Sequence, residues 1–110
     1  MKPLIGLTPT PERKEMEHGT FRLHTLNEHY SQAVINAGGI PVMLPSNNTD
    51  IELLLDRLDA VIVTGGGDID PKEFGQTRHE KTDEIDAERD AFELALVHAA
   101  VARDMPLFGI

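Results

Sequence analysis

The chain of 110 residues contains no cysteine at all. A disulfide, a zinc site built on thiolates and a cysteine nucleophile are therefore all excluded within these residues. The sequence also has no apolar run that approaches membrane-spanning length, and its first residues lack the long apolar core of a signal peptide. These two absences favour a cytoplasmic protein without a membrane segment.

Basic residues are also scarce, with ten Lys and Arg against nineteen Asp and Glu, which gives a formal net charge of −9. A surface with this balance repels nucleic acids and anionic membranes, so we expect neither as a partner. The apolar fraction of 40% is that of a folded globular protein, and the length allows at most one small domain.

Short apolar segments alternate with segments of helical periodicity. The apolar segments predict strands at residues 4–7, 40–45, 60–63 and 105–110. The periodic segments predict helices near residues 26–37, 50–58 and 86–103, the second with the stripe Ile51, Leu54, Leu55 and Leu58. A βαβαβαβ order with short crossovers predicts an α/β fold in which a parallel sheet carries helices on both faces.

Local signals indicate where the helices begin and end. The spacings Thr25 to Glu28 and Thr49 to Glu52 each fit a capping box, and Asp86 is the expected N-cap of the last helix. The pair Gly38 and Gly39 is expected to end the first helix in a left-handed conformation. The polar residues 12–24 show no period, and we expect a surface loop over the first strand that could act as a substrate flap.

The most informative stretch is Ala60-Val-Ile-Val-Thr-Gly-Gly-Gly-Asp-Ile-Asp-Pro71, an apolar strand that stops at three glycines. Glycines can adopt positive φ and leave their N–H groups unshielded, as an anion or a developing oxyanion requires. Ligands in open α/β folds bind just past the carboxyl ends of strands, where this turn is expected. A plain tight turn remains the structural alternative, whereas a P-loop is disfavoured because no Gly-Lys-Ser/Thr follows.

Other polar residues favour structural roles. Asp68 and Asp70 are expected to shape the loop before Pro71 rather than to bind a metal. His98 is expected at the boundary of the apolar side of its helix, and no pair of histidines has ligand-like spacing. The cluster Glu88, Arg89, Asp90 and Glu93 is expected to form a solvated first helical turn with an ion pair, and Tyr30 to belong to the core.

Several motifs together resemble the class I glutamine amidotransferase-like proteins, most closely the γ-glutamyl-γ-aminobutyrate hydrolases of the peptidase C26 group. They are Pro3-Leu-Ile-Gly6, Ala37-Gly-Gly-Ile-Pro-Val-Met-Leu-Pro45, Thr64-Gly-Gly-Gly-Asp-Ile-Asp-Pro71 with Phe74-Gly75, Arg89-Asp-Ala-Phe-Glu93 and Pro106-Leu-Phe-Gly-Ile110. The resemblance spans nearly the whole chain, and it implies a flavodoxin-like three-layer fold of which residues 1–110 are the amino-terminal part.

In the family this chain resembles, the last strand runs into a Cys-Arg-Gly nucleophile, here expected just after Ile110. The resemblance therefore implies a cysteine-dependent γ-glutamyl hydrolase in a longer protein, and an inactive segment when these residues are alone. It implies that the backbone N–H of Gly66, with that of Gly67 beside it, donates a hydrogen bond to the oxyanion of the intermediate.

The resemblance implies a small γ-glutamyl substrate and no cofactor or metal, and it leaves a homo-oligomer open. Two alternatives also remain open, namely a glutaminase domain that passes ammonia to a synthase, and a non-catalytic α/β binding module. The uncovered fourth strand is expected to make these residues poorly soluble by themselves.

Overall fold

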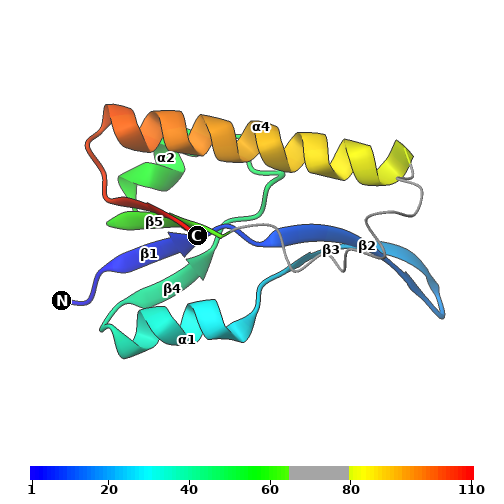
Figure 1. The fold of residues 1–110 in the computed structure, drawn as a ribbon, viewed down its shortest axis with the longest axis horizontal. Coiled ribbons are helices and arrows are strands. Elements are labelled where there is room, and N and C mark those ends of the chain that lie inside the picture. Colours follow the sequence, from blue (N-terminus) through cyan, green and yellow to red (C-terminus); the bar gives the residue numbers. More distant parts are fainter. Residues whose placement is uncertain (65–79) are drawn as a thin grey trace.

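The computed structural model describes residues 1–64 and 80–110, and for residues 80–86 it describes the backbone only. The predicted strands are all present, as β1 (Leu4–Leu7), β4 (Ile40–Met43), β5 (Ala60–Val63) and β6 (Leu107–Gly109). They form one parallel sheet in the order β4-β1-β5-β6 (Figure 1). Counted as parallel strands this order is 2-1-3-4, which is the flavodoxin-like order that we expected.

Three helices enclose the sheet in the described residues, α1 (Glu28–Asn36), α2 (Ile51–Asp56) and α4 (Glu80–Ala102). Figure 1 shows α2 and α4 together on one face of the sheet and α1 on the other. The three-layer architecture predicted from the sequence is therefore confirmed.

The main hydrophobic core lies between the sheet and the α2 and α4 layer. Leu55 and Leu58 of the predicted apolar stripe are buried in it, and Ile51 and Leu54 pack against it. Burial of a leucine side chain contributes about 1.5–3 kcal/mol, so this layer supplies much of the stability of the fold. The members of the core cluster are Leu44, Leu55, Leu58, Val61, Phe92, Leu96 and Ala100.

The prediction of a loop at residues 12–24 is wrong, because these residues form an antiparallel hairpin. Its strands are β2 (Thr10–Met16) and β3 (Gly19–Thr25), and they form a separate two-stranded sheet. Most of its side chains are exposed, so the alternation of apolar and polar residues that marks a half-buried strand is missing. Pairing of backbone groups across a tight connection between Met16 and Gly19 defines these strands instead.

The predicted helix starts are also wrong. Thr25 belongs to β3, and Asn27 caps α1 by accepting a hydrogen bond from the His29 amide over 2.9 Å. At α2, Asp50 occupies the N-cap position without a side-chain capping bond. The two capping boxes fail because other residues occupy the cap positions.

The last helix also begins earlier than predicted, at Glu80 rather than near Asp86. Glu80, Lys81 and Glu84 are strong helix formers, so the helix can extend through this charged segment without an apolar stripe. The predicted left-handed stop is confirmed, since Gly38 follows α1 with a φ of 95°.

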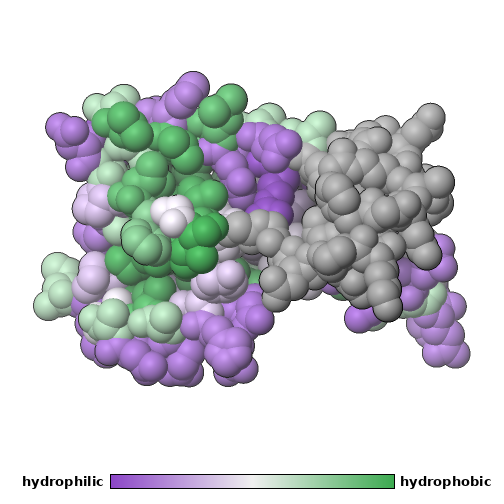
Figure 2. Space-filling model, viewed as in Figure 1, coloured by the Kyte–Doolittle hydropathy of each residue, from purple (hydrophilic) through white to green (hydrophobic). Residues whose placement is uncertain are grey.

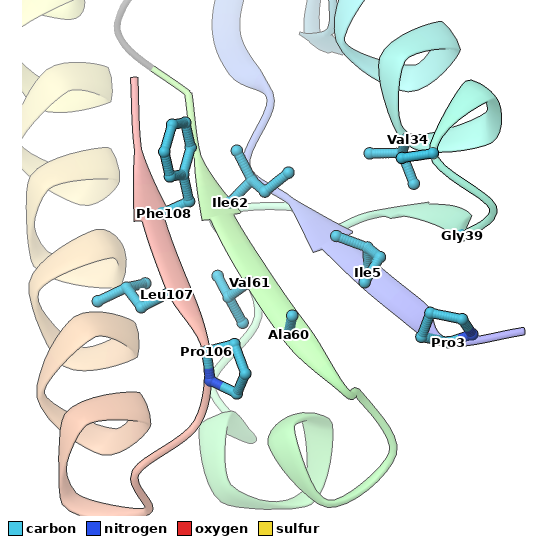
Figure 3. A pocket seen from close by; sticks show the side chains of 11 residues that line it. Pro3, Ile5, Val34, Gly39, Ala60, Val61, Ile62, Pro106, Leu107 and Phe108 are labelled. Carbon is cyan, nitrogen blue, oxygen red and sulfur yellow. The ribbon is translucent and has the colours of Figure 1, made fainter.

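The second face of the sheet is only partly covered. A groove of about 470 Å³ runs over β5 and β6 beside α1, and Ile5, Ala60, Ile62 and Phe108 are among the side chains that line it (Figure 3). Figure 2 shows apolar side chains gathered over this part of the molecule. Phe108 is 62% exposed on this face of β6, whereas Leu107 packs against the core on the other.

Candidate active site

The candidate site lies where the strand order reverses, at the carboxyl ends of β1 and β5. These two strands are adjacent and parallel, so the residues that follow them emerge at the same edge of the sheet. Thr8 follows β1 and Thr64 follows β5. In open α/β sheets this reversal is where a crevice can receive a ligand.

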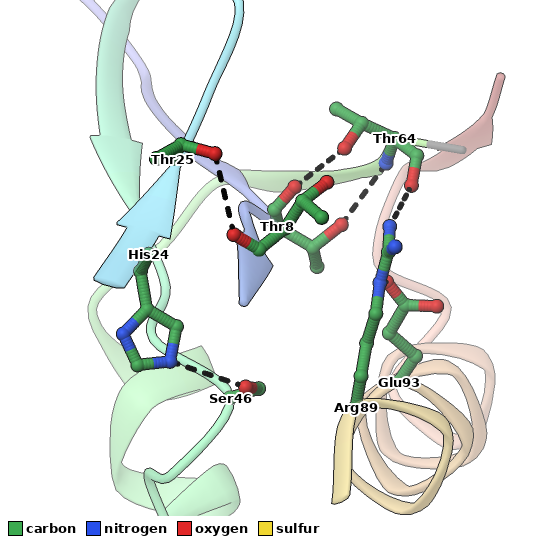
Figure 4. Close-up of polar contacts among 8 residues, drawn as sticks. Thr8, His24, Thr25, Ser46, Thr64, Arg89 and Glu93 are labelled. Carbon is green, nitrogen blue, oxygen red and sulfur yellow. Dashed lines mark hydrogen bonds and ion pairs between the residues drawn. The ribbon is translucent and has the colours of Figure 1, made fainter. Parts of the chain in front are cut away.

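Thr8 and Thr64 are joined by two hydrogen bonds (Figure 4). The Thr64 amide donates to the Thr8 hydroxyl over 3.0 Å, and the Thr64 hydroxyl donates to the Thr8 carbonyl oxygen. Both threonines are buried, with 1% and 2% of their surface exposed. Because a buried polar group is costly when unpaired, this exchange fixes the backbone at the ends of both strands.

Arg89 of α4 holds Thr64 from the opposite side. Its Nη2 donates to the Thr64 carbonyl oxygen over 3.0 Å, and its Nε donates to Glu93 Oε1 over 3.0 Å (Figure 4). The predicted ion pair at this cluster is confirmed, but the predicted solvated turn is wrong for Arg89. The residue is 9% exposed and lies well inside α4, because the helix begins nine residues earlier, at Glu80.

Among the described residues, two polar contacts attach the hairpin to the body of the domain. Arg22 of β3 forms a bidentate ion pair with Glu88 of α4, one arm of which joins Nη1 to Oε2 over 3.0 Å. His24 of β3 lies with Nε2 3.3 Å from the hydroxyl oxygen of Ser46, in the loop after β4 (Figure 4). The hairpin is therefore anchored at its base over the carboxyl edge of the sheet.

These contacts shift two protonation equilibria. Partial burial, together with the positive charge of Arg22, lowers the pKa of His24 below its ordinary value. The hydrogen bond from Arg22 lowers the pKa of Glu88. The shift at Glu88 favours the ionised carboxylate that its ion pair with Arg22 requires, and the shift at His24 favours the neutral imidazole.

Several residues singled out from the sequence lie outside the described residues, namely Gly66, Gly67, Asp68, Asp70 and His79. Of the others, His98 is exposed on α4 rather than at an apolar boundary, and Tyr30 is half-buried. Within residues 1–64 and the described part of α4 and β6, no three potential ligands gather into a metal site.

Sequence reasoning missed Thr8, Ser46 and the role of Arg89. A signal existed for Thr8, since it directly follows a buried strand next to the one that ends at Thr64. Arg89 was part of a recognised motif, but its contact with Thr64 spans 25 positions and depends on how α4 packs. Ser46 carries no such signal, because its contact depends on the unpredicted hairpin.

None of the helices that the structure describes is both long enough and apolar enough to cross a membrane.

Among relatives, a glutamine amidotransferase-like protein of Rickettsia prowazekii is 35% identical over 112 residues, which is 99% of this chain and 40% of that protein. The γ-glutamyl-γ-aminobutyrate hydrolase PuuD of Escherichia coli K12 is 35% identical over 114 residues, which is 98% of this chain and 42% of that protein. The protein NtpR of Enterococcus hirae is 34% identical over a match that covers 100% of this chain and 47% of that protein.

The chain thus spans about two-fifths of the length of the curated relatives it matches. The family model described as peptidase C26 matches residues 3–110, which is nearly the whole sequence. The parallel sheet and the buried contacts at its carboxyl edge agree with the fold that the sequence motifs implied. The chain therefore belongs to the peptidase C26 family.

Proposed function

We propose that this chain is the amino-terminal part of a cysteine-dependent hydrolase that cleaves γ-glutamyl amide bonds. The observation that carries the proposal is the family match over residues 3–110, together with a relative that is named as a γ-glutamyl-γ-aminobutyrate hydrolase. The site at the carboxyl edge of β1 and β5 supports it, because ligands of such sheets bind there.

The reaction would run through a covalent intermediate. A cysteine thiolate attacks the γ-carbonyl carbon, the amine leaves with a proton from a general acid, and water then opens the thioester to release glutamate. The present chain has no cysteine, and its relatives are more than twice as long. The nucleophile therefore belongs to residues beyond these 110, and the chain alone is expected to be inactive.

The contribution of this chain would be electrostatic. The backbone N–H of Gly66, with Gly67 beside it, is proposed to stabilise the oxyanion that forms on the attacked carbonyl. Both glycines lie outside the described residues, but the residue that leads into them, Thr64, is held by Thr8 and Arg89. A fixed residue before the glycines would limit the reorganisation that a proposed Gly66 donor must undergo during the reaction.

The test uses the polypeptide that the gene encodes, including any residues after Ile110. Incubation with γ-glutamyl amides should release glutamate and free amine, detected by mass spectrometry, and alkylation by iodoacetamide should abolish the release. A matched sample of residues 1–110 alone should release nothing. Activity that survives complete alkylation of cysteine would refute the proposed nucleophile.

A glutaminase that supplies ammonia to a synthase is a second candidate, favoured by the relative from Rickettsia that is named as glutamine amidotransferase-like. It would hydrolyse glutamine, and the rate would rise when a synthase partner is added. A hydrolase should act on substituted γ-glutamyl amides without any partner. A protein that binds such amides but cleaves none would instead be a non-catalytic binding module.

A further inference from the structure

Thr64 is held by a hydrogen bond at each of its three polar groups. Its amide donates to the Thr8 hydroxyl, its hydroxyl donates to the Thr8 carbonyl oxygen, and its own carbonyl oxygen accepts from Arg89 (Figure 4). Thr8 directly follows β1, whereas Arg89 belongs to α4. The end of β5 is therefore fixed from two sides, and the bond from Arg89 restrains the Thr64 carbonyl.

That carbonyl belongs to the peptide group that joins Thr64 to Gly65. Because a peptide group is planar, a donor that fixes its carbonyl oxygen also restricts rotation of the whole group. Glycine restricts its own φ and ψ very little, so a restraint on the preceding peptide group matters more here than before a residue with a side chain. Arg89 is thus placed to set the direction in which the chain leaves Thr64 toward the three glycines.

The guanidinium of Arg89 is itself held in place. Its Nε donates to Glu93 Oε1 over 3.0 Å, one turn further along the same helix, and the residue is nearly buried. Burying a cation costs free energy unless it is paired, and Glu93 supplies the pair. A charged donor holds its acceptor roughly twice as strongly as a neutral one. The helix therefore presents a fixed, charged donor to the end of β5.

We infer that Arg89 is a positioning residue for the proposed reaction, acting through Thr64 rather than by contact with the substrate. The inference rests on the proposed hydrolase function, in which Gly66 donates to the oxyanion. The oxyanion develops in the transition state, so loss of Arg89 should slow the chemical step and leave ground-state binding of the substrate largely unchanged. A misplacement of about 1 Å caused by a remote substitution can cost about 10²-fold in rate.

The experiment measures kcat and KM of the full protein with the γ-glutamyl amide that the wild type cleaves fastest. Arg89→Met removes the donor and keeps an unbranched side chain. We expect its kcat to fall about 30- to 100-fold and its KM to change less than about threefold. Arg89→Lys keeps a charged donor but loses the planar fork, so it should restore kcat to within about tenfold of the wild type.

Arg103 provides the matched control, because it makes the same two kinds of bond from just beyond the other end of α4. Its Nη2 donates to the Glu52 carbonyl oxygen over 2.9 Å, and its Nε donates to Glu52 Oε2 over 3.1 Å. Its separation from Arg89 is 103 − 89 = 14 residues, about 21 Å at the rise of a helix. Arg103→Met should keep kcat within about twofold of the wild type.

A second control separates positioning from loss of stability. Leu55→Ala leaves a cavity in the core beneath α2 and removes no hydrogen bond from Thr64. All variants are assayed at a temperature at which circular dichroism shows each of them to be folded. Under these conditions Leu55→Ala should also keep kcat within about twofold of the wild type.

If Arg89→Met does not fold, Glu93→Gln takes its place. This variant keeps the donor to Thr64 but weakens the contact that orients the guanidinium, so kcat should fall about three- to tenfold with KM nearly unchanged. A kcat within about twofold of the wild type in Glu93→Gln would then overturn the inference.

The possible results separate the inference from the proposed function. A wild-type protein that cleaves no γ-glutamyl amide would overturn both. With an active wild type, a kcat of Arg89→Met within about twofold of the wild type would overturn the inference alone. An equal loss of kcat in Arg103→Met or Leu55→Ala, or a loss that lies entirely in KM, would do the same.

Discussion

Arg89 Nη2 donates a hydrogen bond to the carbonyl oxygen of Thr64 over 3.0 Å, and this contact links the longest helix to the carboxyl end of β5. The carbonyl belongs to the last described residue before the three glycines. Because the guanidinium is nearly buried and also bonds Glu93, its position is set by the helix rather than by solvent. The helix and the strand end are therefore joined as one unit.

Replacing this guanidinium by a neutral chain of similar length should destabilise the protein. Arg89→Met leaves the Thr64 carbonyl without its charged donor, so we expect the free energy of unfolding to fall by about 1.5–3 kcal/mol. Urea denaturation followed by circular dichroism measures the change. Arg13→Met, on the exposed part of the hairpin, is the matched control and should stay within about 0.5 kcal/mol of wild type. Equal stability of the two variants would contradict the role assigned to Arg89.

The two threonines should behave as one coupled pair. Thr8→Val leaves the buried Thr64 amide without an acceptor, and Thr64→Val removes the donor to the Thr8 carbonyl oxygen. Each change should cost about 1–3 kcal/mol of unfolding free energy. Each substitution removes a different bond, but both bonds hold the same two backbone segments, so the double variant should cost less than the sum by at least about 0.5 kcal/mol. Strict additivity in this double-mutant cycle would show that the contacts are independent.

Gly6 in β1 should not tolerate a side chain. A Cβ at this position would lie 2.7 Å from Leu44 Cδ1 and 2.8 Å from Leu58 Cδ1, both in the core. Gly6→Ala should therefore lower the free energy of unfolding by about 1–3 kcal/mol through overpacking. Gly109→Ala in β6 is the control, because a Cβ there meets nothing within 4 Å. A loss as large in Gly109→Ala would point to backbone strain rather than packing.

The stability of the protein should fall on mild acidification because of His24. Its pKa in the folded state is lowered, so the unfolded chain binds a proton more readily below the ordinary value of 6.5. Stability from this group is complete above pH 6.5 and is lost as the pH falls through the lower folded-state pKa. His24→Gln should flatten the curve of unfolding free energy against pH in this window. Parallel curves for the two proteins would exclude the effect.

The Glu88 carboxylate acts in the same direction at lower pH. Its pKa is also lowered, chiefly by the hydrogen bond from Arg22, so its contribution is lost as the pH falls below the ordinary value of 4.5. The loss of stability attributed to His24 should therefore be measured at a pH well above 4.5, where Glu88 stays ionised in both the folded and the unfolded state.

The proposed oxyanion donor gives a kinetic prediction. Gly66→Pro removes the N–H assigned to the oxyanion, and the loss of one such donor costs about 2.7–4 kcal/mol of transition-state stabilisation. In the full protein kcat should fall about 10²–10³-fold, while KM for a γ-glutamyl amide changes far less. Steady-state kinetics with a single amide measures both constants. A kcat near that of the wild type would remove Gly66 from the mechanism.

The parallel sheet could be predicted because its strands are short apolar runs and the helices between them show clear apolar stripes. The hairpin could not, since residues such as Lys14 and Glu15 are exposed and carry no burial pattern. Thr25 illustrates the competition between local signals. Its hydroxyl could have capped a helix, but it donates across the hairpin to Thr10, and Asn27 takes the cap.

The sequence predicted at which edge of the sheet the candidate site lies, but not the contacts within the site. Strand order placed Thr64 there, whereas its contacts with Thr8 and Arg89 join positions 56 and 25 residues away. Such contacts depend on register and helix packing, which local periodicity does not encode. The burial of Arg89 was missed for the same reason, because a charged residue in a helix is usually solvated.

The central position of β1 also sets an order of folding during synthesis. Its partners lie far ahead in the chain, since Leu4 pairs with Ile40 and Ile5 with Ala60, at separations of 40 − 4 = 36 and 60 − 5 = 55 residues. At translation rates of about 5–20 residues per second, β1 is synthesised roughly 3 to 11 s before its second partner. The strand pairs within the hairpin are local and can form in microseconds, before the sheet exists.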